Sequence, residues 1–69
     1  MFDKKKFKAR LILSGKTLQE VADILGINLA TLYRKMNGES DFYRNEMQIL
    51  CKELKIDNPA EIFFAEKIT

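Results

Sequence analysis

Histidine is absent from this sequence of 69 residues, and cysteine and proline each occur once. Without histidine the chain cannot use imidazole acid-base chemistry or Ser-His and Cys-His nucleophiles, and it lacks the side chain found in most zinc and haem sites. A single cysteine cannot form an intramolecular disulfide, and such cysteine usage is typical of the cytosol. We therefore expect a chain that is no enzyme and that holds no cofactor, metal or small-molecule ligand.

Long hydrophobic runs are also missing. The longest span residues 11–13 and 62–65, far short of the ~20 residues that cross a bilayer. The basic start precedes too short an apolar stretch for a signal peptide. We expect a cytoplasmic protein with no membrane partner. The length allows one small domain, residues 1–69, in which residues 1–3 are the segment least expected to be ordered.

Charge is distributed unevenly along the chain, although the net charge is only +2. Residues 1–17 carry +5, residues 18–38 carry 0 and residues 39–69 carry −3. A basic front and an acidic tail favour an anionic partner on one side of the molecule. The run from Lys4 to Lys6 has two interpretations: an arm that follows DNA, and a solvated start of a helix.

The pattern of apolar residues predicts an all-α fold of five short helices, because alternation at period 2 is never sustained and helix formers dominate. The first predicted helix runs from about Asp3 to Ser14. Phe7 and Leu11 share one face, with Ile12 beside them.

The next two predicted helices have clear local signals. Thr17 and Glu20 have the spacing of a capping box before a helix that ends at Leu25, and Asn28 is a good N-cap for a helix over 29–37. The inward face of the earlier helix has offsets 0, 3, 4 and 7 and consists of Leu18, Val21, Ala22 and Leu25.

The fourth helix, over about 44–55, has a poor N-cap in Tyr43, whereas Asn58 and Pro59 start the fifth with a capping side chain and a proline at its first position. The inward face of the fourth helix has the same four offsets and consists of Met47, Leu50, Cys51 and Leu54. Cys51 is thereby predicted to be a core residue.

Two helices of about eight residues meet at the short connection of residues 26–28. Ala22 is small enough for the second helix to cross closely, Gly26 supplies a tight turn and Ile27 returns to the core. These features predict a helix-turn-helix at about residues 17–37, a motif whose second helix enters a DNA major groove.

The stretch TLQEVADILGINLATLYRKMNGES resembles the helix-turn-helix of phage Cro and repressor proteins, the XRE-type family. The matching residues are Thr17, Glu20, Val21, Ala22, Leu25, Gly26, Ile27, Leu32, Asn37 and Gly38. The stretch SDFYRNEMQILCKELKIDNPAEIFFAEK is similar to small Cro-like regulators of phages of Gram-positive hosts. The resemblance covers roughly residues 4–67 and implies a five-helix, sequence-specific DNA-binding regulator.

The sequence departs from the family pattern at several positions. Many members have glutamine at Leu18, an apolar residue at Lys35 and an acid at Met36, so we expect Met36 to turn inward and Lys35 to face phosphate. Leu29 and Ala30 stand where Arg, Gln or Ser is common. These two side chains can contact thymine methyl groups but cannot hydrogen-bond a base.

The resemblance implies a set of DNA contacts. Expected near base edges are Leu29, Ala30, Tyr33 and Arg34, with Thr31 close to the backbone. Expected to hold phosphates are Thr17, Gln19, Lys35, Asn37, Ser40 and Arg44, while Asn28 caps its helix and contacts DNA. Arg34 is the best candidate for direct readout, because its guanidinium matches guanine O6 and N7. The alternatives are that Arg34 and Lys35 are ordinary solvated charges and that Tyr33 packs on the domain.

A monomer of this size makes few contacts, so we expect a homodimer on a palindromic double-stranded operator. Phe63 and Phe64 suggest a dimer contact in which one ring enters the core and the other is exposed. A competing hypothesis is a protein-binding module of the same fold, antitoxin-like or antirepressor-like. The small net charge and the apolar residues at Leu18, Leu29 and Ala30 favour that alternative.

Overall fold

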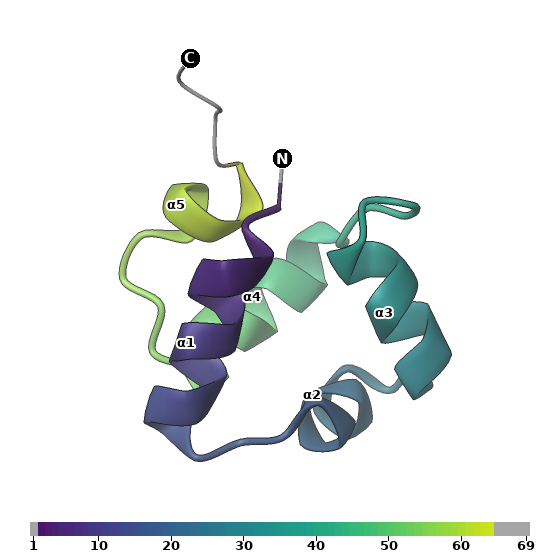
Figure 1. The fold of residues 1–69 in the computed structure, drawn as a ribbon, viewed down its shortest axis with the longest axis horizontal. Coiled ribbons are helices and arrows are strands. Elements are labelled where there is room, and N and C mark those ends of the chain that lie inside the picture. The colour runs from purple at the N-terminus through teal and green to yellow at the C-terminus, as the bar shows by residue number, and fades with distance from the viewer. Residues whose placement is uncertain (1, 65–69) are drawn as a thin grey trace.

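Five α-helices make up the regular structure of residues 2–64, the part of the chain that the computed structural model describes. They are α1 (Lys4–Ser14), α2 (Leu18–Leu25), α3 (Leu29–Met36), α4 (Arg44–Glu53) and α5 (Pro59–Phe63). No strand occurs within residues 2–64, and the predicted all-α fold is confirmed. Figure 1 shows α1 and α5 side by side at one end of the molecule and α3 at the other. None of the five helices is long and apolar enough to cross a bilayer.

The core draws side chains from all five helices and from Leu54 and Ile56 between α4 and α5. Its buried members are Phe7, Leu11, Val21, Ala22, Leu32, Met36, Leu50, Leu54, Ile56, Ile62 and Phe63. The prediction for Phe7 and Leu11 is confirmed, but the placement of Ile12 beside them is wrong, because Ile12 is 80% exposed. Each residue turns a helix by about 100°, so Ile12 leaves the narrow stripe that Phe7 and Leu11 present to the core.

The chain packs into the fold from Phe2 onward. The Phe2 ring lies 5.1 Å from Phe7, 5.0 Å from Phe42 and 5.7 Å from Phe63, measured between ring centroids. Asp3 accepts a hydrogen bond from the Lys6 N–H and caps α1. Phe2 thus joins α1, the α3–α4 connection and α5, whereas Met1 lies outside the described residues.

The inward face of α4 agrees with the predicted offsets. Leu50 and Leu54 are fully buried, and Met47 and Cys51 are half-buried against them. Burial raises the pKa of the Cys51 thiol, so the thiol is protonated at neutral pH. Cys51 therefore belongs to the packing of the core.

The ends of α4 and α5 differ from the predictions. α4 stops at Glu53, two residues early, because Lys55 takes a left-handed conformation (φ 53°) and the Ile56 N–H bonds back to the Cys51 carbonyl at 2.9 Å. This turn brings Ile56 into the core. Asn58 precedes Pro59 as predicted, but its side chain makes no capping hydrogen bond.

Candidate nucleic-acid interface

The N-terminus of α2 is held by a complete capping box. The Thr17 hydroxyl accepts from the Glu20 N–H at 3.2 Å, and the Glu20 carboxylate accepts from the Thr17 N–H at 3.1 Å. Both side chains are exposed, and so is Gln19, whose amide donates to Asp23. The exposed amide end of α2 carries a partial positive charge that suits a phosphate group.

The turn between α2 and α3 is set by two residues. Gly26 has φ 71°, in the left-handed region, and a Cβ at this position would meet no atom within 4 Å, so glycine is needed for its conformation and not for space. Asn28 then accepts from the Thr31 N–H at 2.8 Å and starts α3. Ala22 is fully buried, and α2 and α3 pack directly on each other. The predicted helix-turn-helix is therefore formed, and its second helix is fixed in direction.

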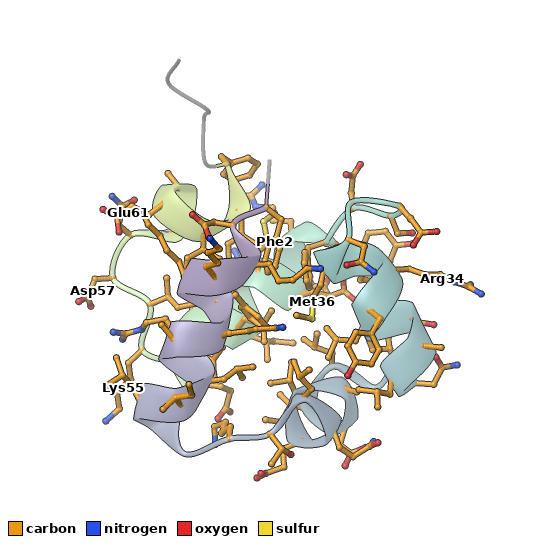
Figure 2. All side chains as sticks on the ribbon, viewed as in Figure 1. Phe2, Arg34, Met36, Lys55, Asp57 and Glu61 are labelled. Carbon is orange, nitrogen blue, oxygen red and sulfur yellow. The ribbon has the colours of Figure 1, made fainter. Side chains whose placement is uncertain are left out.

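The outer face of α3 presents Ala30, Tyr33 and Arg34 to solvent. Tyr33 is 45% exposed, so part of its side chain packs on the domain and part faces solvent. Figure 2 shows the Arg34 side chain extending away from the rest of the molecule. Leu29 and Thr31 are each half-buried. Leu29 packs against the core, so only part of its side chain is free to contact a base edge.

The prediction that Lys35 faces phosphate is wrong. Lys35 is 5% exposed, and its ammonium donates to the Glu46 carboxylate at 2.8 Å and to the Asp41 carbonyl at 3.1 Å. The ammonium also lies 4.0 Å from the centre of the Tyr43 ring. Position 35 follows the buried Leu32 by three residues and therefore points toward the start of α4. Met36 turns inward, as expected.

Glu46 is the residue that the sequence reasoning missed. Its carboxylate accepts from both the Lys35 ammonium and the Tyr43 N–H, the latter at 2.8 Å, and only 4% of the residue is exposed. It thus supplies the N-terminal contact for α4 that the Tyr43 side chain does not make. The sequence did offer a signal for this contact, because a glutamate at the third position of a helix can accept from the N–H of the residue that precedes the helix.

The connection between α3 and α4 holds the remaining predicted contacts. Asn37, Ser40 and Arg44 are all exposed. Lys4 donates a hydrogen bond to the Asn37 side chain, which brings the start of α1 to the end of α3. Lys4, Lys5 and Lys6 are helical, and thus not an extended arm. Lys4 is therefore a cation near this surface that the predicted contact set omits.

The predicted DNA contacts other than Lys35 lie on the start of α2, the start and outer face of α3, the α3–α4 connection and the first residue of α4. Arginine can donate two parallel hydrogen bonds to guanine or to phosphate. In residues 2–64, no cluster of three or more His, Cys, Asp or Glu residues is arranged to hold a metal ion. Arg34 and Arg44 are the exposed guanidinium groups of residues 17–44 that can make such paired hydrogen bonds.

Comparison with protein families agrees with this geometry. A model of the Cro/C1-type HTH DNA-binding domain matches residues 6–67. The chain belongs to this family. Searches of curated proteins and of solved structures found no match. Membership in the Cro/C1-type family indicates a regulator that binds double-stranded DNA. In helix-turn-helix proteins generally, the second helix of the motif enters the major groove.

Proposed function

We propose that this protein is a sequence-specific transcription regulator, a Cro-like repressor of a phage or prophage, that acts in the cytoplasm by occupying an operator. The observation that carries the proposal is the contrast within α3. Leu32, Lys35 and Met36 are buried, while Tyr33 and Arg34 are exposed on a helix whose start is fixed by a capped turn. Such a rigid helix with a free outer face can enter a major groove.

The proposed contacts divide into two classes. Arg34 would read guanine through O6 and N7, Ala30 and the exposed part of Leu29 would contact thymine methyl groups, and Tyr33 would lie beside them. Groups proposed to hold phosphates are the side chains of Thr17, Gln19, Asn28, Thr31, Asn37, Ser40 and Arg44. Phosphate contacts fix the register of the protein without specifying the sequence. Lys35 is removed from this set because its ammonium is buried.

Selection of bound fragments from random double-stranded DNA tests the proposal. The expected result is an enriched motif with two-fold symmetry and half-sites about 34 Å apart, one helical turn. Binding to the enriched site should weaken steeply as salt rises, because each phosphate contact releases counterions. Failure to enrich any motif, together with failure to retain DNA at low salt, would contradict the proposal.

A homodimer on DNA is the second part of the proposal, and the region around Phe64 supports it. Phe63 is buried, as one of the two rings was predicted to be, whereas Phe64 is 61% exposed. Phe64 lines a groove of about 880 Å³ together with Phe2 and Phe42. In a two-fold dimer the exposed Phe64 rings of the two copies would pack on each other, since such an interface uses the same patch twice.

Sedimentation of the protein on DNA tests the dimer. Two chains per palindromic site are expected, and Phe64→Ser should lower the apparent affinity for the full site while leaving affinity for an isolated half-site unchanged. A stable complex of one chain with a single half-site, at the full affinity, would overturn the dimer.

The groove also favours the competing function, a module that neutralises a protein partner. Exposed aromatic side chains at Phe64 and Tyr43 are suited to such a contact. Salt separates the two functions, because binding through aromatic side chains depends weakly on ionic strength and DNA binding depends on it steeply.

A further inference from the structure

The outer side of α1 exposes an aliphatic pair that the DNA-binding proposal does not use. Ile12 and Leu13 are 80% and 74% exposed, more than any other large hydrophobic residue within residues 2–64. Ala9 is also exposed and lies one turn before both of them. Single apolar side chains on a surface are ordinary, but three adjacent ones on one helix face form a contiguous patch.

Lysines continue this patch toward the start of the helix. Lys5 lies four residues before Ala9, and Lys8 lies four residues before Ile12, so both lysines adjoin the aliphatic residues on the helix surface. The segment from Lys4 to Ser14 contains no acidic residue. The nearest carboxylate in the sequence, Asp3, accepts from the Lys6 N–H at the helix start. We call Lys5, Lys8, Ala9, Ile12 and Leu13 the α1 outer face.

The α1 outer face remains available when α3 is occupied. Figure 1 shows α1 and α3 at opposite ends of the molecule, and α1 packs chiefly against α5. Arg34 points away from α1 (Figure 2). Base contacts made by the outer face of α3 therefore do not involve the residues of the α1 outer face.

We propose that the α1 outer face binds an acidic protein segment, an amphipathic helix that carries carboxylates beside aliphatic side chains. Lysines next to an aliphatic strip are complementary in charge and polarity to such a helix. If the proposed function also holds, the chain would bring this segment to its operator. The binding itself does not depend on that function.

Other occupants fit the α1 outer face less well. A second copy in a two-fold contact would bring the four lysines of the two faces into one interface without any carboxylate from α1 to balance them, which is unfavourable. DNA phosphates would bind the lysines, but they make no favourable contact with the aliphatic side chains of Ile12 and Leu13. A bilayer binds helices with a broad apolar face, and here Phe7 and Leu11 are committed to the core, which leaves two large aliphatic side chains.

Four synthetic helical peptides of equal length test the proposal with the full chain. One carries glutamates beside a leucine stripe, the second has the glutamates replaced by glutamine, the third has the leucines replaced by serine, and the fourth has the glutamates replaced by lysine. The expected result is that the first peptide binds at least ten-fold tighter than the other three. Backbone amide NMR shifts should then concentrate on residues 5–13, with and without bound DNA.

Variants of the chain locate the contact. Ile12→Ser with Leu13→Ser, and separately Lys5→Glu with Lys8→Glu, should each weaken binding of the acidic peptide at least ten-fold. The charge control Lys52→Glu should leave it unchanged, because this lysine is exposed on α4. These results stand whether or not the protein binds DNA.

Three outcomes would overturn the proposal. The first is that no peptide binds, or that the glutamine peptide binds as well as the acidic one. The second is that the serine variant at positions 12 and 13 binds normally or that the shifts map to α3. The third is that phosphatidylserine vesicles bind the chain while the acidic peptide does not, which would assign the α1 outer face to a lipid surface.

Discussion

The two connections that flank α3 are stabilised in different ways. Between α2 and α3, the chain turns through Gly26 and restarts at Asn28, and each hydrogen bond of the turn joins residues close in sequence. Between α3 and α4, the ordering contacts are the buried pair of Lys35 and Glu46 and the ring of Phe42 against Phe2. The first connection is local, whereas the second depends on residues brought together by the fold.

This difference separates the two tasks of the proposed DNA surface. The local turn fixes the direction of α3, which carries the residues proposed to read bases. The long-range pair holds the start of α4, and with it Arg44, against the end of α3. Loss of the pair should therefore affect stability and the phosphate contact of Arg44 together, while loss of a single cap should cost a smaller amount of stability.

Breaking the buried ion pair should have the largest effect. Glu46→Gln leaves the Lys35 ammonium buried without a countercharge, and this costs about 3–5 kcal/mol of unfolding free energy. The total stability of such a domain is about 5–15 kcal/mol. Urea denaturation at 25 °C measures the loss.

The matched control is the double variant Lys35→Met with Glu46→Gln. It removes both charges, while the introduced glutamine side chain keeps an oxygen that can accept from the Tyr43 N–H. Most of the lost stability should return, because no buried charge is then left without a partner. Equal losses in the single and double variants would show that the buried charge is not the cause.

Removing the cap of α3 should have an intermediate effect. Asn28→Ala deletes the acceptor of the Thr31 N–H, which costs about 1 kcal/mol. The same urea titration measures it, with Asn28→Ser as the control that retains a capping oxygen. An alanine variant as stable as the parent would contradict the local account of this turn.

The smallest effect is expected at the other asparagine that precedes a helix. Asn58 makes no capping hydrogen bond to α5, so Asn58→Ala should change the unfolding free energy by less than about 0.5 kcal/mol. Comparison of the urea denaturation midpoints of Asn28→Ala and Asn58→Ala therefore tests directly which of the two predicted N-caps is formed. A loss at Asn58 equal to that at Asn28 would mean that both caps operate.

The sequence predicted the elements whose signals are local. Thr17 with Glu20, Gly26 and Asn28 each act on residues at most four or five positions away, so spacing alone identifies the helix-turn-helix. The inward faces of α2 and α4 follow from the 3.6-residue period in the same way. Local signals failed at Ile12, because a short helix buries a narrow stripe, at Asn58, whose predicted cap is not formed, and at the end of α4.

The sequence predicted the candidate site less well where the exposure of a side chain depends on residues far away in the sequence. Arg34 and Lys35 are adjacent basic residues, and nothing local distinguishes the exposed one from the buried one. Their difference depends on Glu46, which reaches α3 only after the chain has folded. Lys4 beside Asn37 is a second such contact, since 33 positions separate the two residues.

The central claim is that the outer face of α3 reads bases while the start of α4 holds the backbone, and paired variants on the selected operator test it most directly. Affinities of Arg34→Ala and Arg44→Ala are measured for the operator and for every single base-pair change in it. Arg34→Ala should lose about 1–3 kcal/mol of discrimination at one base pair, while Arg44→Ala should weaken all sites alike and reduce the salt slope by about one. An Arg34→Ala protein that keeps the full preference at every base pair would contradict the account.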